Sequence, residues 1–131
     1  MEKNKVKEIF TWLVVAGWLV VIFSFSAIKG TGDHAFSWAY FFERKSMHVI
    51  EYAILAALFY RAFSQSFAMK KALWFSLACS LLYAVSDEWH QTFVFGREGV
   101  IRDVLIDLVG ISIAVFFLWK FNKKKNVSDN S

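Results

Sequence analysis

The feature that most constrains this chain is a run of 20 residues without a charged side chain, Ile9–Ile28. A helix rises about 1.5 Å per residue, so this run is long enough to cross a hydrocarbon layer of about 30 Å. The lysines before it, with Ser24, Ser26 and Ala27 at its end, also resemble a secretory signal peptide. The apolar run is longer than the usual core of a signal peptide, however, and no A-x-A cleavage site follows it. We therefore expect a retained first membrane span.

Composition extends this expectation to the whole chain. Apolar residues make up 57% of the 131 residues, aromatic residues make up 19%, and there is no proline to interrupt a long helix. This balance argues against an ordinary soluble domain, which cannot bury so much apolar surface. We predict an all-α fold, an integral membrane bundle that forms one domain over residues 1–131, with four transmembrane helices at about 9–28, 46–63, 72–91 and 100–119 and a tail at 120–131.

An interfacial segment is expected between the first and second spans. The run Ala35–Phe42 is rich in aromatic residues but too short to cross the membrane. Trp38 and Tyr40 are suited to the boundary between lipid and water, where a ring is half buried and its polar edge is wet. The segment is either a plain linker or a lid over a site at that surface.

Basic residues predict the orientation of the spans. The two termini and the loop between the second and third spans hold ten of the 15 lysines and arginines, and the other side holds five. Because basic loops stay inside, we expect a multi-pass protein with both termini and the tail in the cytoplasm. Terminal lysine clusters can also bind nucleic acid, but beside apolar spans they indicate anchoring near anionic lipid. We therefore expect a membrane-lipid partner and no nucleic acid.

Polar side chains interrupt the second, third and fourth spans at one depth. His48, Asp87 and Asp107 each lie roughly 20 Å from the cytoplasmic end of their span, at about 1.5 Å per residue. Placing such groups in lipid costs about 2.5–3.5 kcal/mol each unless they pair or reach water. Spacings of three or four residues put the polar groups of each span on one face, and Gly110 on the Asp107 face predicts a close helix crossing. The sequence thus predicts one polar pocket that opens outward.

The polar residues divide into two candidate roles. Carboxylates and an imidazole can carry protons as general acids and bases, which makes the catalytic candidates His48, Asp87, Glu88 and Asp103. Basic and hydrogen-bonding side chains around them can hold a phosphate or a carboxylate, which makes the substrate-binding candidates Lys45, Glu51, Tyr52, Gln91, Arg97, Arg102 and Asp107. His90 is expected to be an interfacial residue, and Tyr83 a packed ring with a bonded hydroxyl.

Several of these residues stand in an order that resembles the VanZ-like family of small bacterial membrane proteins: Lys45-x-x-His48-x-x-x-Tyr52, Asp87-Glu88-x-x-Gln91, Gly96-Arg97, Asp103 followed by Gly110, and the Phe-Ser-Phe-Ser stretch at 23–26. The resemblance implies a protein of the bacterial cytoplasmic membrane and cell envelope, associated with antibiotic resistance, in particular to the lipoglycopeptide teicoplanin. It implies no settled reaction. One departure is Asp107, where the family more often has an amide such as asparagine.

Several functions are compatible with such a pocket. An enzyme would act on an envelope lipid headgroup or a lipid-linked glycan precursor. A binder would hold the same headgroup, a peptidoglycan precursor or a lipoglycopeptide without chemistry. Transport is less well supported, because four spans without inverted halves offer little for alternating access. The remaining alternative is a structural network that only fixes helix packing.

A metal ion is the cofactor that these residue types could hold. His48 and the carboxylates of the third and fourth spans could form a site of nitrogen and oxygen ligands. There is no H-E-x-x-H motif and no cysteine ligand set, and Lys45 and Arg97 can neutralise the carboxylates instead. We therefore expect no metal and no other cofactor.

Overall fold

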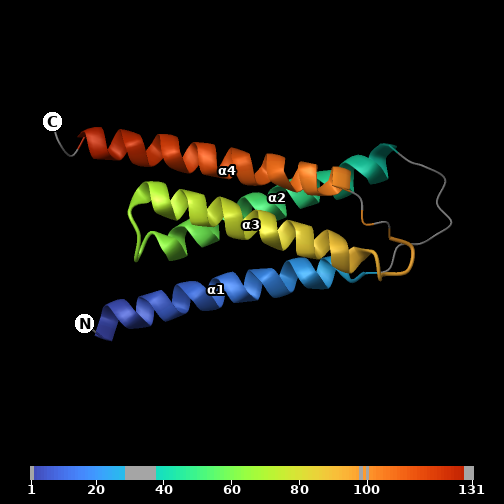
Figure 1. Ribbon diagram of the computed structural model, residues 1–131, viewed down its shortest axis with the longest axis horizontal. Coiled ribbons are helices and arrows are strands. Elements are labelled where there is room, and N and C mark those ends of the chain that lie inside the picture. The colour runs from blue at the N-terminus through green and yellow to red at the C-terminus, as the bar shows by residue number, and fades with distance from the viewer. Residues whose placement is uncertain (1, 29–37, 98, 100, 129–131) are drawn as a thin grey trace.

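The computed structural model describes residues 2–28, 38–97, 99 and 101–128, which form four helices: α1 (Glu2–Ser26), α2 (Trp38–Phe63), α3 (Met69–Gln91) and α4 (Ile101–Ser128). Figure 1 shows both termini at one end of the bundle, together with the turn between α2 and α3. The end of α1, the start of α2 and the connection from α3 to α4 lie at the opposite end. The all-α expectation is confirmed.

Two of the described helices are long and apolar enough to cross a membrane. They are α1 and the part of α4 from Ile101 to Lys125. Helices α2 and α3 have comparable lengths but carry the polar side chains of the predicted pocket. The structure therefore confirms four helices and supplies two candidate spans. Each helix is longer than the span predicted for it, and α4 continues to Ser128 through most of the predicted tail at 120–131.

Helix α2 begins earlier than the predicted second span. Trp38–Phe42 are its first residues and continue directly into the rest of the helix, whereas the expectation was a separate interfacial segment. The remainder of that segment, Ala35–Ser37, lies outside the described residues. No proline or glycine occurs between Ala35 and Phe63, so nothing in the backbone chemistry interrupts the helix at Phe42.

Helix α2 is the centre of the bundle and packs against α1, α3 and α4. Helix α1 has little direct contact with α3. The apolar core lies along α2 and consists of Val15, Ile22, Tyr52, Leu55, Ala56, Phe59, Ala62, Ala84 and Ile111. Three of these residues are alanines, and small side chains let neighbouring helices approach closely.

Helices α2 and α4 cross at Gly110. A β-carbon on Gly110 would collide with the backbone of Val49, so a side chain there would force the helices apart. His48 precedes Val49, and Asp107 lies one helical turn before Gly110. The crossing predicted from Gly110 is therefore present, and it brings His48 and Asp107 face to face.

Two long-range hydrogen bonds attach α1 to the bundle. The Trp18 indole Nε1 donates to the Glu51 carbonyl at 3.0 Å, and the Tyr83 hydroxyl donates to the Leu19 carbonyl at 2.6 Å. The expected bonded hydroxyl of Tyr83 is thus confirmed. These bonds hold α1 in place where its packing against α3 is sparse.

The outside of the bundle is strongly apolar on every helix. Large side chains such as those of Phe10, Ile50, Trp74, Leu82 and Ile101 are each more than half exposed. A soluble monomer rarely exposes apolar patches of more than a few hundred Å². Several ionisable side chains, among them Glu51, Asp87, Glu88 and Asp107, are instead buried inside the bundle, whereas the lysines near the ends of α1 and α4 are exposed.

Candidate functional site

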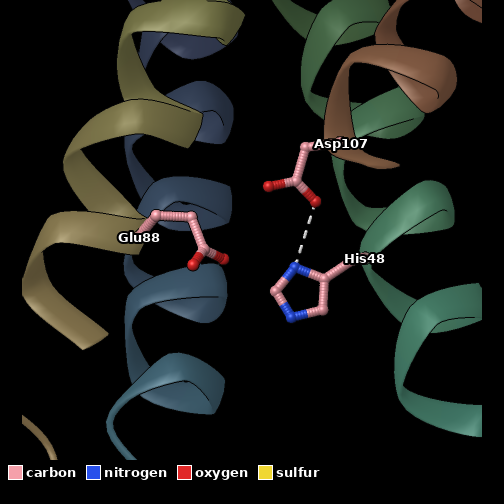
Figure 2. A group of neighbouring side chains, drawn as sticks. All are labelled: His48, Glu88 and Asp107. Atoms are coloured by element: carbon pink, nitrogen blue, oxygen red, sulfur yellow. Dashed lines mark hydrogen bonds and ion pairs between the residues drawn. The ribbon is translucent and has the colours of Figure 1, made fainter. Parts of the chain in front are cut away.

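Three helices each contribute one ionisable side chain to a buried cluster, which we call the HED cluster: His48 from α2, Glu88 from α3 and Asp107 from α4 (Figure 2). The His48 Nδ1 atom lies 3.1 Å from Asp107 Oδ1, within hydrogen-bonding distance. One ring nitrogen of His48 and one oxygen of each carboxylate all lie within 4.8 Å of one another. Figure 2 shows the Glu88 carboxylate pointing from α3 towards the His48–Asp107 pair.

A second set of buried groups joins the end of α1 to α3. The Ser26 hydroxyl donates to Asp87 Oδ2 at 2.7 Å. The Gln91 amide donates to the same oxygen at 3.2 Å and to Glu88 Oε1 at 3.3 Å. Because Gln91 contacts both neighbouring carboxylates, this set is continuous with the HED cluster. The predicted face formed by Asp87, Glu88 and Gln91 is therefore present.

Asp107 Oδ2 is a buried polar atom with no hydrogen-bond partner among the described residues. The Tyr52 hydroxyl and Asp87 Oδ1 are buried beside it, and these two side chains lie within reach of each other. Asp107 and Tyr52 are completely buried, and Asp87 is 3% exposed. Buried polar groups are nearly always hydrogen-bonded, and leaving one unpaired costs about 1–3 kcal/mol. The interior therefore has capacity for a further polar or charged ligand.

A cavity of about 250 Å³ lies beside the cluster, lined by Phe25, Ser26, Ile28, Glu43, Arg44, Met47, His48, Glu51 and Arg97. It lies between the end of α1, the first half of α2 and the connection after α3. His48 belongs both to the wall of this cavity and to the HED cluster. The cavity is thus connected through His48 to the buried acid–base groups.

Arg97 holds the end of α1 against the connection that follows α3. Its Nε donates to the Ile28 carbonyl at 3.0 Å, and its Nη2 donates to the Phe25 carbonyl at 2.9 Å. Its Nη1 donates to Gln91 Oε1 at 3.3 Å. Carbonyls at the end of a helix lack intrahelical partners, and a positive charge there is favourable. Arg97 therefore builds a wall of the cavity in addition to adding charge to it.

The turn before Arg97 depends on a glycine. Gly96 has a φ of 74°, in the left-handed region that glycine adopts at little cost. This conformation follows the end of α3 and turns the chain so that the next side chain reaches α1. The Gly96-Arg97 pair of the sequence pattern therefore acts as one structural unit.

Lys45, Arg102 and Asp103 form a separate group next to the HED cluster. The Lys45 ammonium forms an ion pair with Asp103 Oδ2, and Arg102 Nε lies 3.7 Å from Asp103 Oδ1. The Arg102 side chain is 63% exposed. None of the three is among the residues that line the cavity. The structure therefore places these predicted site residues one helical turn away from Asp107.

Glu51 and Tyr52 lie on the same side of α2 as His48 but in different surroundings. Glu51 lines the cavity and is 7% exposed. Tyr52 is completely buried, and its ring is stacked on that of His48 with centroids 6.4 Å apart. Tyr52 thus lies beside the imidazole inside the bundle, while Glu51 faces the cavity.

Sequence reasoning missed three polar residues of the cavity wall: Ser26, Glu43 and Arg44. Arg44 lies four residues before His48, so the same spacing that grouped His48 with Tyr52 extends backwards to it. Ser26 belonged to the quoted Phe-Ser-Phe-Ser stretch, but its contact with Asp87 joins residues 61 positions apart. His90, expected at the interface, packs its ring 4.4 Å from that of Phe23, outside the cavity wall.

Comparison with known proteins identifies the chain at the level of its family. No curated protein and no solved structure matches it significantly. The model of the VanZ/LLP1 family matches residues 6–122, which include all four helices almost completely and every residue of the HED cluster. The resemblance drawn from the sequence motifs is confirmed, and the chain belongs to the VanZ/LLP1 family.

Proposed function

We propose that this VanZ/LLP1 protein is a four-span protein of the bacterial cytoplasmic membrane, with both termini in the cytoplasm. Exposed apolar side chains on α2 and α3, such as Ile50, Trp74 and Leu82, support membrane contact by these helices as well as by the two candidate spans. Both termini and the α2–α3 turn lie at one end, and the lysine clusters of the chain are found in those same segments. Basic segments remain on the cytoplasmic side.

The cavity would then open towards the outer leaflet, at the end of the bundle opposite the termini. Its volume of about 250 Å³ is below the range of about 300–1,000 Å³ typical of drug-sized ligands, which favours a small polar head over a whole glycan. Arg44 and Arg97 place two guanidinium groups in its wall. Guanidinium groups recognise phosphate and carboxylate oxygens. The substrate we propose is an envelope lipid or lipid-linked glycan precursor that inserts its anionic head.

The chemistry that the site supports best is acid–base catalysis on that head. The observation that carries it is the position of His48, which lines the cavity while its Nδ1 faces the buried Asp107 carboxylate. A hydrogen bond from Nδ1 to a carboxylate fixes the tautomer and leaves Nε2 as a proton acceptor. His48 would therefore take a proton from a hydroxyl or water in the cavity, with Glu88 as the nearest second carboxylate.

Modification of such a lipid would change the envelope that a lipoglycopeptide meets. The resemblance to the VanZ-like family implies an association with teicoplanin resistance, so we propose reduced teicoplanin susceptibility as the effect in cells. The second candidate is a binder that holds the same head without reaction. The many hydrogen bonds that fix Ser26, Asp87, Gln91 and Arg97 favour it, because they indicate a rigid recognition surface.

The test compares cells that express the wild-type chain with cells that express His48→Ala, and uses His90→Ala as the matched control. His90 packs on Phe23 and does not line the cavity. Lipid extracts are compared by mass spectrometry, and teicoplanin susceptibility is measured in parallel. We expect one lipid species to be present in cells that express the wild type or the control. Its rate of formation should be at least about a hundredfold lower with His48→Ala, which is the usual scale for loss of an acid–base group.

Two results would decide against parts of this proposal. If teicoplanin susceptibility changes with the wild type while no lipid species does, the protein binds without catalysis. If His48→Ala inserts normally and retains the full effect of the wild type on both measurements, the cavity is not the functional site.

A further inference from the structure

The three side chains of the HED cluster are the residue types that bind divalent metal ions. Imidazole nitrogen suits zinc and other transition metals, and carboxylate oxygen is accepted by zinc and manganese alike. They come from three different helices, so the bundle itself brings them together. One atom from each lies within 4.8 Å of the other two, which leaves room for an ion between them.

The distance between two of these atoms already fits shared coordination. Two ligands about 2.1 Å from one ion, at an angle of about 95–110°, are about 3.1–3.4 Å apart. His48 Nδ1 and Asp107 Oδ1 are 3.1 Å apart. Glu88 has a longer side chain, whose carboxylate points towards this pair in Figure 2 and has an oxygen within 4.8 Å of the ligand atoms of the other two residues.

An independent observation also points to a cation at this place. Asp107 is completely buried, yet its second oxygen, Oδ2, has no hydrogen-bond partner among the described residues. In Figure 2 this oxygen points towards the side of the cluster from which Glu88 enters. Asp87 lies close enough for its charge to act on both His48 and Asp107. Several carboxylates in one buried place are costly without compensating positive charge.

The sequence-based argument against a metal concerned Lys45 and Arg97, which it expected to neutralise the carboxylates of the site. In the structure Lys45 forms an ion pair with Asp103, which is not a member of the cluster. Arg97 donates to the carbonyls of Phe25 and Ile28 and to the Gln91 amide oxygen. Each cation therefore has at least one partner outside the three ligands.

We propose that His48 Nδ1, Glu88 and Asp107 bind one divalent transition-metal ion, with Zn²⁺ and Mn²⁺ as the ions that suit one imidazole and two carboxylates. The ion would take the place of the proton that Nδ1 otherwise shares with Asp107, since metal ligands must be deprotonated. It would leave coordination positions open on the cavity side for water or a substrate oxygen. An ion of this kind activates a bound water or polarises a phosphoryl oxygen.

This inference rests on the same site as the proposed function and changes the role of His48. With Nδ1 on an ion, the neutral imidazole would carry its proton on Nε2, so a water on the ion, and not His48, would supply the base. The inference does not require the proposed lipid substrate. Binding of the ion can be measured on the protein alone. A failure of the metal experiment leaves the lipid experiment unaffected, and the reverse is also true.

The experiment uses the full chain purified in detergent, stripped with EDTA and dialysed against ZnCl₂ or MnCl₂. After desalting, the metal content per chain is measured by inductively coupled plasma mass spectrometry. We expect about one ion per wild-type chain and affinity at least about tenfold weaker in Glu88→Gln and Asp107→Asn, since even outer-shell changes cost 10–100-fold. Glu2→Gln is the matched control, because Glu2 is an exposed carboxylate at the start of α1, at the end of the bundle away from the cluster.

A second readout identifies the histidine and does not depend on affinity. Pulsed electron paramagnetic resonance of the Mn²⁺-loaded wild type should show coupling to one imidazole nitrogen. The coupling should disappear in His48→Gln and persist in His90→Ala. Thermal unfolding of each stripped variant establishes that it is folded before loading, and added metal should raise the midpoint only where the site is intact.

Three results would overturn the proposal. One is a stripped, folded wild type that binds neither ion stoichiometrically. Another is equal binding by the wild type, Glu88→Gln and Asp107→Asn, which would place the metal elsewhere on the chain. The third is bound Mn²⁺ without nitrogen coupling, which would remove His48 from the ligand set.

Discussion

The backbone carbonyl of Val49 occupies the place where a side chain on Gly110 would begin. The contact between α2 and α4 is therefore a contact of two backbones. It fixes the separation of the helices that carry His48 and Asp107, and it explains how two side chains 59 positions apart reach hydrogen-bonding distance.

Gly110→Ala should consequently destabilise the protein and separate His48 from Asp107. Because the obstacle is backbone, it cannot rotate aside, and overpacking of this kind costs about 1–3 kcal/mol. Gly17→Ala is the control, since a β-carbon at Gly17 meets no atom within 4 Å. This substitution replaces a poor helix former and should raise the free energy of unfolding by up to about 1 kcal/mol. Thermal unfolding in detergent checks both, and equal midpoints for the two variants would contradict the close crossing.

Arg97→Ala should release the end of α1. The substitution removes donors to the Phe25 and Ile28 carbonyls, and hydrogen bonds from charged groups contribute about 1.5–3 kcal/mol. Hydrogen exchange of the amides near residues 23–28 should become faster, while exchange in the middle of α3 stays unchanged. Arg61→Ala, an exposed arginine at the other end of the bundle, serves as the control. Unchanged exchange in Arg97→Ala would show that α1 is held by its packing alone.

The Lys45–Asp103 pair should behave as a coupled unit. Its side chains are 18% and 12% exposed, so both charges are largely out of water. Lys45→Met and Asp103→Asn should each destabilise the chain, and the double variant should cost less than the sum by about 0.5–3 kcal/mol. A double-mutant cycle of unfolding free energies measures this coupling. Strict additivity would mean that the contact contributes nothing to stability.

Tyr83→Phe should destabilise the protein. The substitution deletes the bond to the Leu19 carbonyl and should cost about 1 kcal/mol. The measurement is thermal unfolding of EDTA-treated protein in detergent. An unchanged midpoint would show that this bond contributes nothing to the attachment of α1.

The proposed topology predicts that a reporter fused after Lys125 is active only inside the cell. A reporter inserted after Gly96 would face the other side, at the end of the bundle away from the termini. Paired fusions with enzymes that work only in the cytoplasm or only outside it provide the measurement. Activity of the C-terminal fusion outside the cell alone would reverse the orientation.

The fold was largely predictable because it depends on local chemistry. The uncharged run Ile9–Ile28 is long enough to specify a helix by itself, and spacings of three and four residues placed the polar groups on common faces. The start of α2 at Trp38 was less predictable. An aromatic run such as Trp38–Phe42 fits either a segment at the membrane surface or the first turns of a helix. No proline or glycine follows it to mark where a separate segment would end.

The composition of the site was also predictable, but its pairings were not. The residues of the HED cluster were all among the candidates, because buried ionisable groups at one depth must meet. Which cation meets which carboxylate depends on side-chain reach across helices, however. Lys45 meets Asp103 one turn above the cluster, and Arg97 reaches carbonyls of α1 up to 72 positions away. No local pattern encodes such distances.

The attachment of α1 by Arg97 has a consequence for biogenesis. The residues that bind the end of α1, Asp87 and Arg97, follow it by 61 to 72 positions. While the ribosome is still making α2, the first helix has none of these partners. In the proposed topology it would wait in the bilayer as an independent unit, and the cavity would acquire its final wall only when the segment after α3 has crossed to the outer side. Assembly of the site would then be one of the last events of synthesis, and a truncated chain that ends within α3 would insert without forming it.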